Sequence, residues 1–308
     1  MDTLPPPRIG DAPARSLVDR VVAVVALKTL PAAKSRLSAL PDPLRERLAR
    51  CMAIDTLAAL RPAVREIVVV SDQPDLAPAL RRRGLDVRLL AEPDPAASVA
   101  HVSSRGSLNL ALAHADSLLR ADGVETVLAC VGDLPALRTR SVQQVIVGSR
   151  AWSRSFLTDH DELGTTMLVA RGVPLDPFYG TEISGGQRIG SSVRHAASGA
   201  VALALGALPD ARRDVDTTAD LATAAGLGVG AATASLLDPT TGALGAYQPV
   251  EVLSGDGTHL TVLVDGVART LPFDGSTPLQ TYDGDQALVV PGRRLHAVRV
   301  ADDLRCWA

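Results

Sequence analysis

Short apolar runs alternate with helix-like segments through roughly the first 230 residues, and this rhythm constrains the fold more than any other feature. The strand-like runs, rich in Val, Ile and Leu, lie at residues 21–27, 66–71, 87–90 and 127–131. Nearly continuous apolar runs of this kind are typical of parallel strands that are covered on both faces. Between them, residues 43–60 and 107–119 have apolar side chains at helical spacing, with Ser107 as the expected N-cap. This order predicts an α/β fold with a mainly parallel, Rossmann-like sheet flanked by helices.

The pattern changes after residue 150. Two short strand-like runs, at residues 155–158 and 165–170, predict a hairpin that leaves the main sheet. Further strand-like runs, separated by Gly and Asp turns, lie at residues 250–253, 260–264, 287–290 and 295–300. We therefore expect a disordered tail at residues 1–19, a main domain at residues 20–238 and a small β-rich module at residues 239–308.

Composition excludes several classes of partner. The formal net charge of −3 and an aromatic content of 3% disfavour a nucleic-acid-binding surface. The three cysteines, Cys51, Cys130 and Cys306, are scattered without the spacing of metal ligands, which fits buried thiols in a reducing compartment. The N-terminal segment lacks the apolar core of a secretory signal, and the apolar run at residues 21–27 is too short to span a bilayer. We expect a cytoplasmic protein without a membrane or nucleic-acid partner.

Acidic residues stand where strand-like segments end. The sequence VLACVGDLPAL brings Gly132 and Asp133 to the C-terminal edge of the sheet, where open α/β sheets bind ligands. Asp214 and Asp216 are two residues apart, so their side chains point to the same side of an extended segment. Three such carboxylates could hold Mg²⁺, which prefers hard oxygen ligands. Alternatively, Asp133 is a helix N-cap, and Thr217 caps the next helix with Asp216 as a favourable charge.

Three cations follow the first strand-like run. Lys28, Lys34 and Arg36 lie within nine residues at the predicted ligand-binding edge of the sheet. Lysine supplies a point charge and arginine a planar fork, and both suit a polyphosphate. The alternative is a solvated loop before a helix. The chain has neither the phosphate-binding loop motif of ATPases and GTPases nor the glycine fingerprint of dinucleotide-binding domains.

Two stretches rich in Gly, Ser and Thr are candidates for binding an anion. Their residues are Thr165 and Thr166 in the first, and Gly180, Gly190, Ser191, Ser192, Arg194 and His195 in the second. Hydroxyl groups and backbone N–H groups at a helix N-terminus are common anion ligands. Alternatively, Ser191 or Ser192 is only an N-cap. Arg194 and His195 either face the anion or lie on a solvated helix surface.

Six motifs, taken in order, resemble one known family. They are ALKTLPAAKSRL, then Ser107-Leu108-Asn109, GDLPAL, LGTT, SSVRH and DVDTTADL. Over residues 20–232 the chain is similar to the phospholactate/phosphoenolpyruvate guanylyltransferases of coenzyme F420 biosynthesis. The resemblance implies a glycosyltransferase-A-like nucleotidyltransferase fold. It also implies transfer of GMP from GTP to phosphoenolpyruvate or 2-phospho-L-lactate, release of pyrophosphate, and the downstream F420 transferase as a candidate partner.

The resemblance assigns roles to individual residues. The implied Mg²⁺ ligands are Asp133, Asp214 and Asp216. The implied phosphoacid-binding residues are Thr165 or Thr166, Gly180 or Gly190, Ser191 and Ser192. The residues implied to meet GTP are Lys28, Lys34, Arg36, Leu108, Asn109 and Gly132. Asp133 and the three cations would carry catalysis.

The chain departs from the family pattern in two places. Its glycine–threonine stretch is one residue shorter, and the link between an aromatic–glycine pair and SSVRH is lengthened by TEISGGQRIG. Two rival functions remain: a molybdopterin guanylyl- or cytidylyltransferase, and a catalytically silent binding protein. The first rival has a glycine-rich loop similar to LAGGxxxRM where this chain has ALKTLPAAKSRL. The second gives no reason to keep three acidic residues together, because buried carboxylates are costly without a cation.

Overall fold

The computed structural model describes most of the chain from residue 20 onward. The described ranges are 20–27, 37, 39–73, 76–81, 83–93, 106–184, 186–255, 259–264, 266–272, 294–300 and 303–307. The predicted tail at residues 1–19 lies outside them, as do the predicted strand at 287–290 and the cations Lys28, Lys34 and Arg36.

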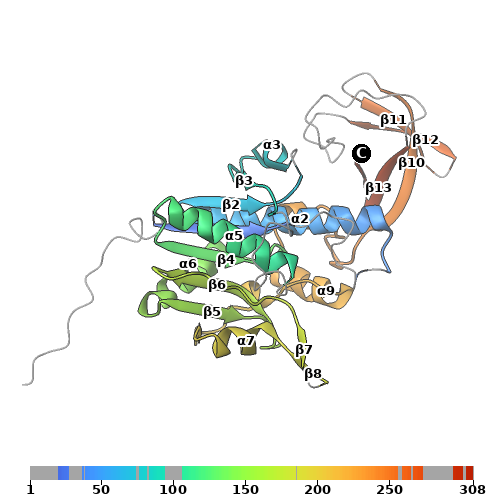
Figure 1. Cartoon of the computed structure of the whole chain (residues 1–308). Helices are drawn as coiled ribbons and strands as arrows, with labels where there is room; N and C mark the ends of the chain where they lie inside the picture. The colour runs from blue at the N-terminus through green and yellow to red at the C-terminus, as the bar shows by residue number, and fades with distance from the viewer. Residues whose placement is uncertain are drawn as a thin grey trace, which may run out of the picture.

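A seven-stranded sheet forms the centre of the main part of the molecule (Figure 1). In spatial order its strands are β3 (Arg88–Leu90), β2 (Glu66–Val70), β1 (Val21–Ala26), β4 (Thr126–Cys130), β6 (Thr165–Arg171), β5 (Arg154–Thr158) and β9 (Val201–Ala202). The first four are mutually parallel. β6 runs antiparallel to both of its neighbours, and β9 is parallel to β5. The predicted mainly parallel, Rossmann-like sheet is confirmed.

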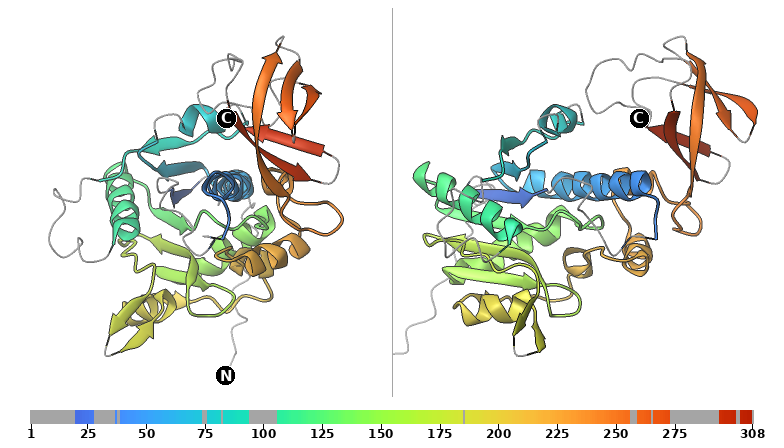
Figure 2. Two further views of the ribbon diagram at one scale, coloured as in Figure 1. Left: turned by 90° about the vertical axis from the view of Figure 1, so that its right-hand side faces the viewer. Right: turned by 45° about the vertical axis from the view of Figure 1, so that its right-hand side comes forward.

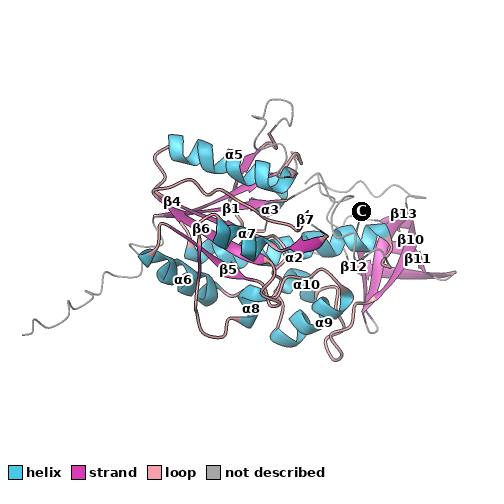
Figure 3. Ribbon diagram, turned by 60° about the horizontal axis from the view of Figure 1, so that its bottom comes forward, coloured by secondary structure: helices cyan, strands magenta, loops and turns pink. Residues whose placement is uncertain are grey.

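Helices pack on both faces of this sheet (Figure 3). The helical segments of the described chain are α2 (Asp42–Leu60), η3 (Arg61–Ala63), α3 (Leu76–Arg81), α5 (Ser107–Ala121), α6 (Thr139–Gly148), η5 (Ser149–Ala151), α7 (Ser191–Ala197), α8 (Pro209–Arg212), α9 (Thr218–Leu227) and α10 (Ala231–Ala234). In β1, Val25 packs in a cluster with residues of α2 and α6, whereas Val24 packs with residues of α5. Because both faces of β1 are covered, the strand has no polar position.

Two local predictions are wrong. The hairpin of β5 and β6 forms, but it does not leave the main sheet, because β6 pairs with β4 from Thr126 to Cys130. β6 thereby covers the edge that β4 would otherwise expose, and six of its seven residues are buried. Ser107 is not an N-cap either, because Gly106 occupies that position and Ser107 begins α5.

A second sheet follows the main domain. Its order is β12 (Val267–Pro272), β11 (His259–Val264), β10 (Ala246–Gly255), β13 (Arg294–Val300) and β14 (Asp303–Trp307), and all of its pairs are antiparallel. The predicted β-rich C-terminal module is confirmed. Its strands β12 and β14 escaped prediction because charged and polar residues interrupt their apolar pattern. Figure 2 shows α2 extending from the main sheet towards this module, and Tyr247 of β10 packs against apolar residues of α2 and α9.

Helix length and the environment of two cysteines were also predicted from the sequence. Every helix in the described part of the chain is too short or too polar to span a lipid bilayer. Cys51 and Cys130 are buried among apolar side chains, as expected of thiols that act as small hydrophobic residues. Burial raises the pKa of the Cys51 thiol, so this side chain is neutral at physiological pH.

Candidate active site

Three carboxylates converge at the C-terminal edge of the central sheet. Asp133 follows β4, and Asp214 and Asp216 lie between α8 and α9. Each side chain is half-buried and offers one oxygen atom, and the three atoms lie within 4.8 Å of one another. We refer to Asp133, Asp214 and Asp216 as the acidic cluster. A set of donors made only of carboxylate oxygens suits a hard divalent cation.

Backbone hydrogen bonds hold the two halves of the acidic cluster together. The N–H of Val215 donates to the carbonyl of Asp133 at 3.1 Å. The N–H of Leu134 donates to the buried hydroxyl of Thr56 in α2, also at 3.1 Å. The loop after β4 is therefore fixed on two sides, and the position of Asp133 depends on α2 as well as on the segment before α9.

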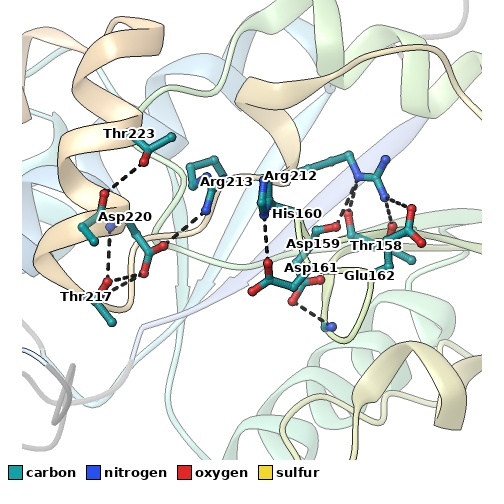
Figure 4. Close-up of polar contacts among 12 residues, drawn as sticks. Thr158, Asp159, His160, Asp161, Glu162, Arg212, Arg213, Thr217, Asp220 and Thr223 are labelled. Atoms are coloured by element: carbon teal, nitrogen blue, oxygen red, sulfur yellow. Dashed lines mark hydrogen bonds and ion pairs between the residues drawn. The ribbon is translucent and has the colours of Figure 1, made fainter.

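A capping box begins α9 next to the acidic cluster (Figure 4). The N–H of Asp220 donates to the Thr217 hydroxyl at 3.2 Å, and the N–H of Thr217 donates to the Asp220 carboxylate at 2.9 Å. The N–H of Asp216 donates to the same carboxylate at 3.3 Å. Burial alone would raise the pKa of Asp220, but the hydrogen bonds from Thr217 and Asp216 and the charge of Arg213 lower it overall. Thr217 therefore caps α9, as the alternative to a metal site predicted. The two interpretations are compatible, because Asp216 also belongs to the acidic cluster.

Arg212 connects the acidic cluster to the turn between β5 and β6 (Figure 4). Its guanidinium donates to the carbonyl of Thr158 at 3.1 Å and to that of Asp159 at 3.3 Å. In return, the carbonyl of Arg212 accepts the N–H of His160 at 2.7 Å. Because Arg212 lies two residues before Asp214, these contacts fix the acidic segment relative to the turn that precedes Thr165.

The same turn fixes the start of α7. The hydroxyl of Ser192 contacts the carbonyls of Glu162 and Leu163 at 2.8 and 2.9 Å, and its N–H donates to Leu163 at 3.2 Å. A Cβ atom at Gly190 would meet the Leu163 carbonyl oxygen at 2.0 Å, so only glycine fits there. Gly190 is itself the N-cap, so the alternative in which Ser191 or Ser192 caps α7 is wrong.

His195 of α7 is fully buried and joins two other segments. Its Nδ1 lies 2.9 Å from the Thr165 hydroxyl, and its Nε2 accepts the N–H of Phe178 at 2.8 Å. Burial, followed by the charges of Arg194 and Arg154, lowers the pKa of His195 to about 4. We refer to His195, Thr165 and Phe178 as the histidine network. The sequence had suggested either anion contact or a solvated helix surface for His195, and its complete burial contradicts the second.

Arg194 and Asn109 hold the strand-like link before Gly180. Arg194 donates to the carbonyl of Tyr179 at 2.9 Å and pairs with Glu182 at 3.3 Å. The side chain of Asn109 donates to the Tyr179 carbonyl at 3.0 Å and accepts the Tyr179 N–H at 2.7 Å. Gly180 follows with φ of +85°, a conformation that side chains other than hydrogen disfavour. Sequence reasoning had not found this use of Asn109, although an asparagine within an apolar helix stripe is a signal of a buried polar contact.

The remaining predicted site residues are placed as follows. Leu108 is partly buried beside the cluster that contains α5, and Gly132 lies in the loop after β4. Thr166 is buried, with its backbone carbonyl accepting the N–H of Val131 at 3.0 Å. The lengthened link that follows Gly180 forms a small hairpin of β7 (Glu182–Ser184) and β8 (Gln187–Ile189).

Comparison with known proteins identifies the family. The chain is 40% identical over 217 residues to the phosphoenolpyruvate guanylyltransferase of Mycolicibacterium gilvum, a match that covers 70% of this chain and 93% of that relative. The chain belongs to the phosphoenolpyruvate guanylyltransferase family. The relative so named from Geodermatophilus obscurus is 41% identical over 222 residues, covering 70% of this chain and 92% of the relative. The one from Streptomyces coelicolor is 40% identical over 218 residues, covering 69% and 93%.

No protein-family model matches this member of the guanylyltransferase family. Among solved structures, a nucleotidyl transferase from Methanothermobacter thermautotrophicus aligns with a TM-score of 0.39 and 19% identity, over 66% of this chain and 94% of that one. The family relationship therefore comes from the relatives at about 40% identity.

Proposed function

We propose that this protein transfers GMP from GTP to phosphoenolpyruvate and releases pyrophosphate, as a step of coenzyme F420 biosynthesis. The observation that carries the proposal is the acidic cluster, which two distant segments build in a chain about 40% identical to proteins named phosphoenolpyruvate guanylyltransferase. The rival molybdopterin nucleotidyltransferase and the silent binding protein find no such support.

We infer that the acidic cluster holds Mg²⁺. Its half-buried oxygen atoms, which lie within 4.8 Å of one another, fit a small hard cation. When bound, the cation would supply positive charge that balances the negative charge of the phosphates. Asp133, Asp214 and Asp216 would hold it, and the hydrogen bond from the N–H of Val215 to the carbonyl of Asp133 keeps their spacing.

The proposed reaction is an in-line displacement. A phosphate oxygen of phosphoenolpyruvate forms a bond to the α-phosphorus of GTP, and the bond from that phosphorus to the bridging oxygen of the pyrophosphate breaks. The attacking oxygen is already anionic at neutral pH, so no side chain needs to remove a proton. Catalysis then depends on positioning and on balancing negative charge. We assign Lys28, Lys34 and Arg36 to the departing pyrophosphate, where fixed cations stabilise developing charge.

Two sets of residues would bind the substrates. For the phosphoacid we propose Thr165 or Thr166, Gly180 or Gly190, and the neighbouring Ser191 and Ser192. For GTP we propose the three cations together with Leu108, Asn109 and Gly132. The contacts of Arg212 support this division, because they join the acidic cluster to the turn before Thr165.

The experiment is a pyrophosphate-release assay with the purified full chain, GTP and Mg²⁺. Phosphoenolpyruvate, 2-phospholactate and 3-phosphoglycerate are supplied one at a time, and the product mass is measured. We expect turnover with phosphoenolpyruvate and a product with the mass of a guanylylated phosphoacid. Omission of the phosphoacid is the control, and molybdopterin as the acceptor, with GTP or CTP as the donor, tests the molybdopterin-type rival. Turnover with none of the three phosphoacids would contradict the proposal.

A further inference from the structure

His195 connects all three segments that the proposed function assigns to the phosphoacid. Its ring contacts Thr165 of β6 and the backbone of Phe178, and it lies on the same short helix as Ser191. The ring is enclosed by Phe156, Phe178 and Tyr179, with ring centroids 5.7, 6.0 and 5.3 Å away. A side chain held this closely has a single orientation available.

The hydrogen bonds determine which ring nitrogen holds the proton. A backbone N–H can only donate, so the Nε2 atom that faces Phe178 must be the acceptor. The proton of the neutral ring is therefore on Nδ1, where it is donated to the Thr165 oxygen. The oxygen of the Thr165 hydroxyl then accepts the hydrogen bond from His195. Its own O–H group is left to donate a hydrogen bond to a group other than His195.

We infer that His195 is a positioning residue for phosphoacid binding, acting by making the Thr165 hydroxyl a hydrogen-bond donor to the substrate. This inference rests on the proposed function. Among the described residues, His195 is the only hydrogen-bond partner of that hydroxyl. The hydroxyl can therefore donate a hydrogen bond to an anionic oxygen of the phosphoacid. A phosphate or carboxylate has only acceptor oxygens at neutral pH, so a hydroxyl fixed as a donor binds it better than one that rotates freely.

The surroundings of His195 keep this arrangement constant. Arg194 and Arg154 are the cations that act on the ring, and Asp176 is the one acidic group that opposes them among the described residues. Arg154 is itself paired with Asp176 at 3.3 Å. With Nε2 occupied by a backbone donor, the ring has no site for a second proton without breaking the bond to Phe178.

Two substitutions separate the two ends of the ring. His195→Gln retains an acceptor near the Nε2 position but loses the donor to Thr165. His195→Asn retains a donor near the Nδ1 position but loses the acceptor for Phe178. We expect His195→Gln to raise the KM for phosphoenolpyruvate about tenfold, the effect of losing one hydrogen bond to a charged group. We expect the KM of this variant for GTP to stay within about twofold of the wild-type value. In His195→Asn, which keeps the donor to Thr165, the KM for phosphoenolpyruvate should stay close to the wild-type value.

A double-mutant cycle links the effect to Thr165. If His195 acts through that hydroxyl, Thr165→Val raises the same KM, and adding His195→Gln to it has little further effect. His160→Gln is the matched control, since that histidine is exposed and contacts Asp161. Additive effects of the two substitutions, or equal changes in both KM values, would overturn the inference.

A measurement that does not depend on turnover completes the test. Nitrogen NMR of the imidazole in the wild-type protein reports which nitrogen holds the proton, and we expect Nδ1–H. Detection of the Nε2–H form would overturn the inference even if the enzyme is active. A wild-type protein that releases no pyrophosphate with any phosphoacid would instead contradict the proposed function.

Discussion

The acidic cluster and the histidine network lie in the same candidate site but are built in different ways. In the acidic cluster, three like charges are brought within 4.8 Å by backbone contacts such as the one from Val215 to Asp133. In the histidine network, the neutral ring of His195 has a protein partner at each nitrogen. The carboxylates of the acidic cluster repel one another and suit a bound cation, whereas both nitrogens of the His195 ring already have a partner within the protein.

This difference predicts different consequences of substitution. Removing a member of the acidic cluster relieves repulsion and should affect activity far more than stability. Removing a member of the histidine network leaves a buried polar group without its partner, which affects stability as well.

Asp133→Ala should lower kcat by at least about 10²–10³-fold, the usual loss for one preorganised electrostatic contact. Because a like charge is removed, the metal-free protein should unfold at the same temperature or higher. Steady-state pyrophosphate release and a thermal melt in EDTA measure the two effects. Asp161→Ala, at an exposed position, is the control. Activity above about a tenth of wild type would reject a role of Asp133 in holding the cation.

Lowering the pH should destabilise the protein through His195. Its pKa is about 4 in the folded protein, against 6.5 for the ordinary group, so the unfolded chain takes up the proton first. The free energy of unfolding is therefore unaffected by protonation of His195 above pH 6.5. It falls as the pH is lowered from 6.5 towards 4, by about 1.4 kcal/mol per pH unit and about 3 kcal/mol in total.

Urea unfolding at pH 7.5 and at pH 5 checks this dependence, with the two pH values chosen on either side of the ordinary value. Because carboxylates also titrate, the informative quantity is the difference between wild type and His195→Asn. That variant should lose less stability on acidification, and His160→Gln should lose as much as the wild type. Equal pH dependence in wild type and His195→Asn would show that the ring is not held neutral by the fold.

If the acidic cluster holds Mg²⁺ as proposed, adding the cation should stabilise the folded wild-type protein. At a concentration one hundred times the Kd, the expected gain is about 2.7 kcal/mol of unfolding free energy. Asp216→Ala should abolish most of this gain, while His195→Asn should keep it if the two regions are independent. Thermal melts over a Mg²⁺ titration test both statements, and a full response in Asp216→Ala would place the cation elsewhere.

Thr217→Ala should have the smallest effect, a loss of about 1 kcal/mol in unfolding free energy from the missing helix cap. Because Asp220 would lose one of the groups that orient it, the neighbouring Asp216 should also hold the cation less tightly. Thr223→Ala, in the same helix and exposed, is the matched control. If Thr217→Ala weakens Mg²⁺ binding no more than Thr223→Ala does, the capping box supports α9 alone.

Much of the architecture could be predicted from local patterns. The parallel strands β1, β2 and β4 are largely apolar because both of their faces are covered, and a run of neighbouring residues is enough to show this. The insertion of β6 between β4 and β5 could not be read in the same way. Strand pairing depends on which edge is open in the assembled sheet, and the hairpin sequence is compatible with either arrangement.

The active-site region shows the same division. The acidic cluster was expected from Asp133 at a strand end and from the spacing of Asp214 and Asp216, because the ends of parallel strands meet at one edge. The contacts of His195 with Thr165 and Phe178 join residues 30 and 17 positions away. No local pattern encodes such pairs.

Short segments and motifs of the sequence carry the order of most strands and helices, the position of Asp133 at the end of a strand and the membership of a guanylyltransferase family. They do not carry the place of Asp214 and Asp216, which were expected at the end of a strand and lie between α8 and α9. Only the tertiary structure decided that Thr217 caps a helix beside the acidic cluster, that Asn109 binds the backbone of Tyr179, and that His195 is buried. Burial and hydrogen-bond partners depend on what the rest of the chain brings alongside, and the same imidazole on an open surface would titrate near its ordinary pKa of 6.5.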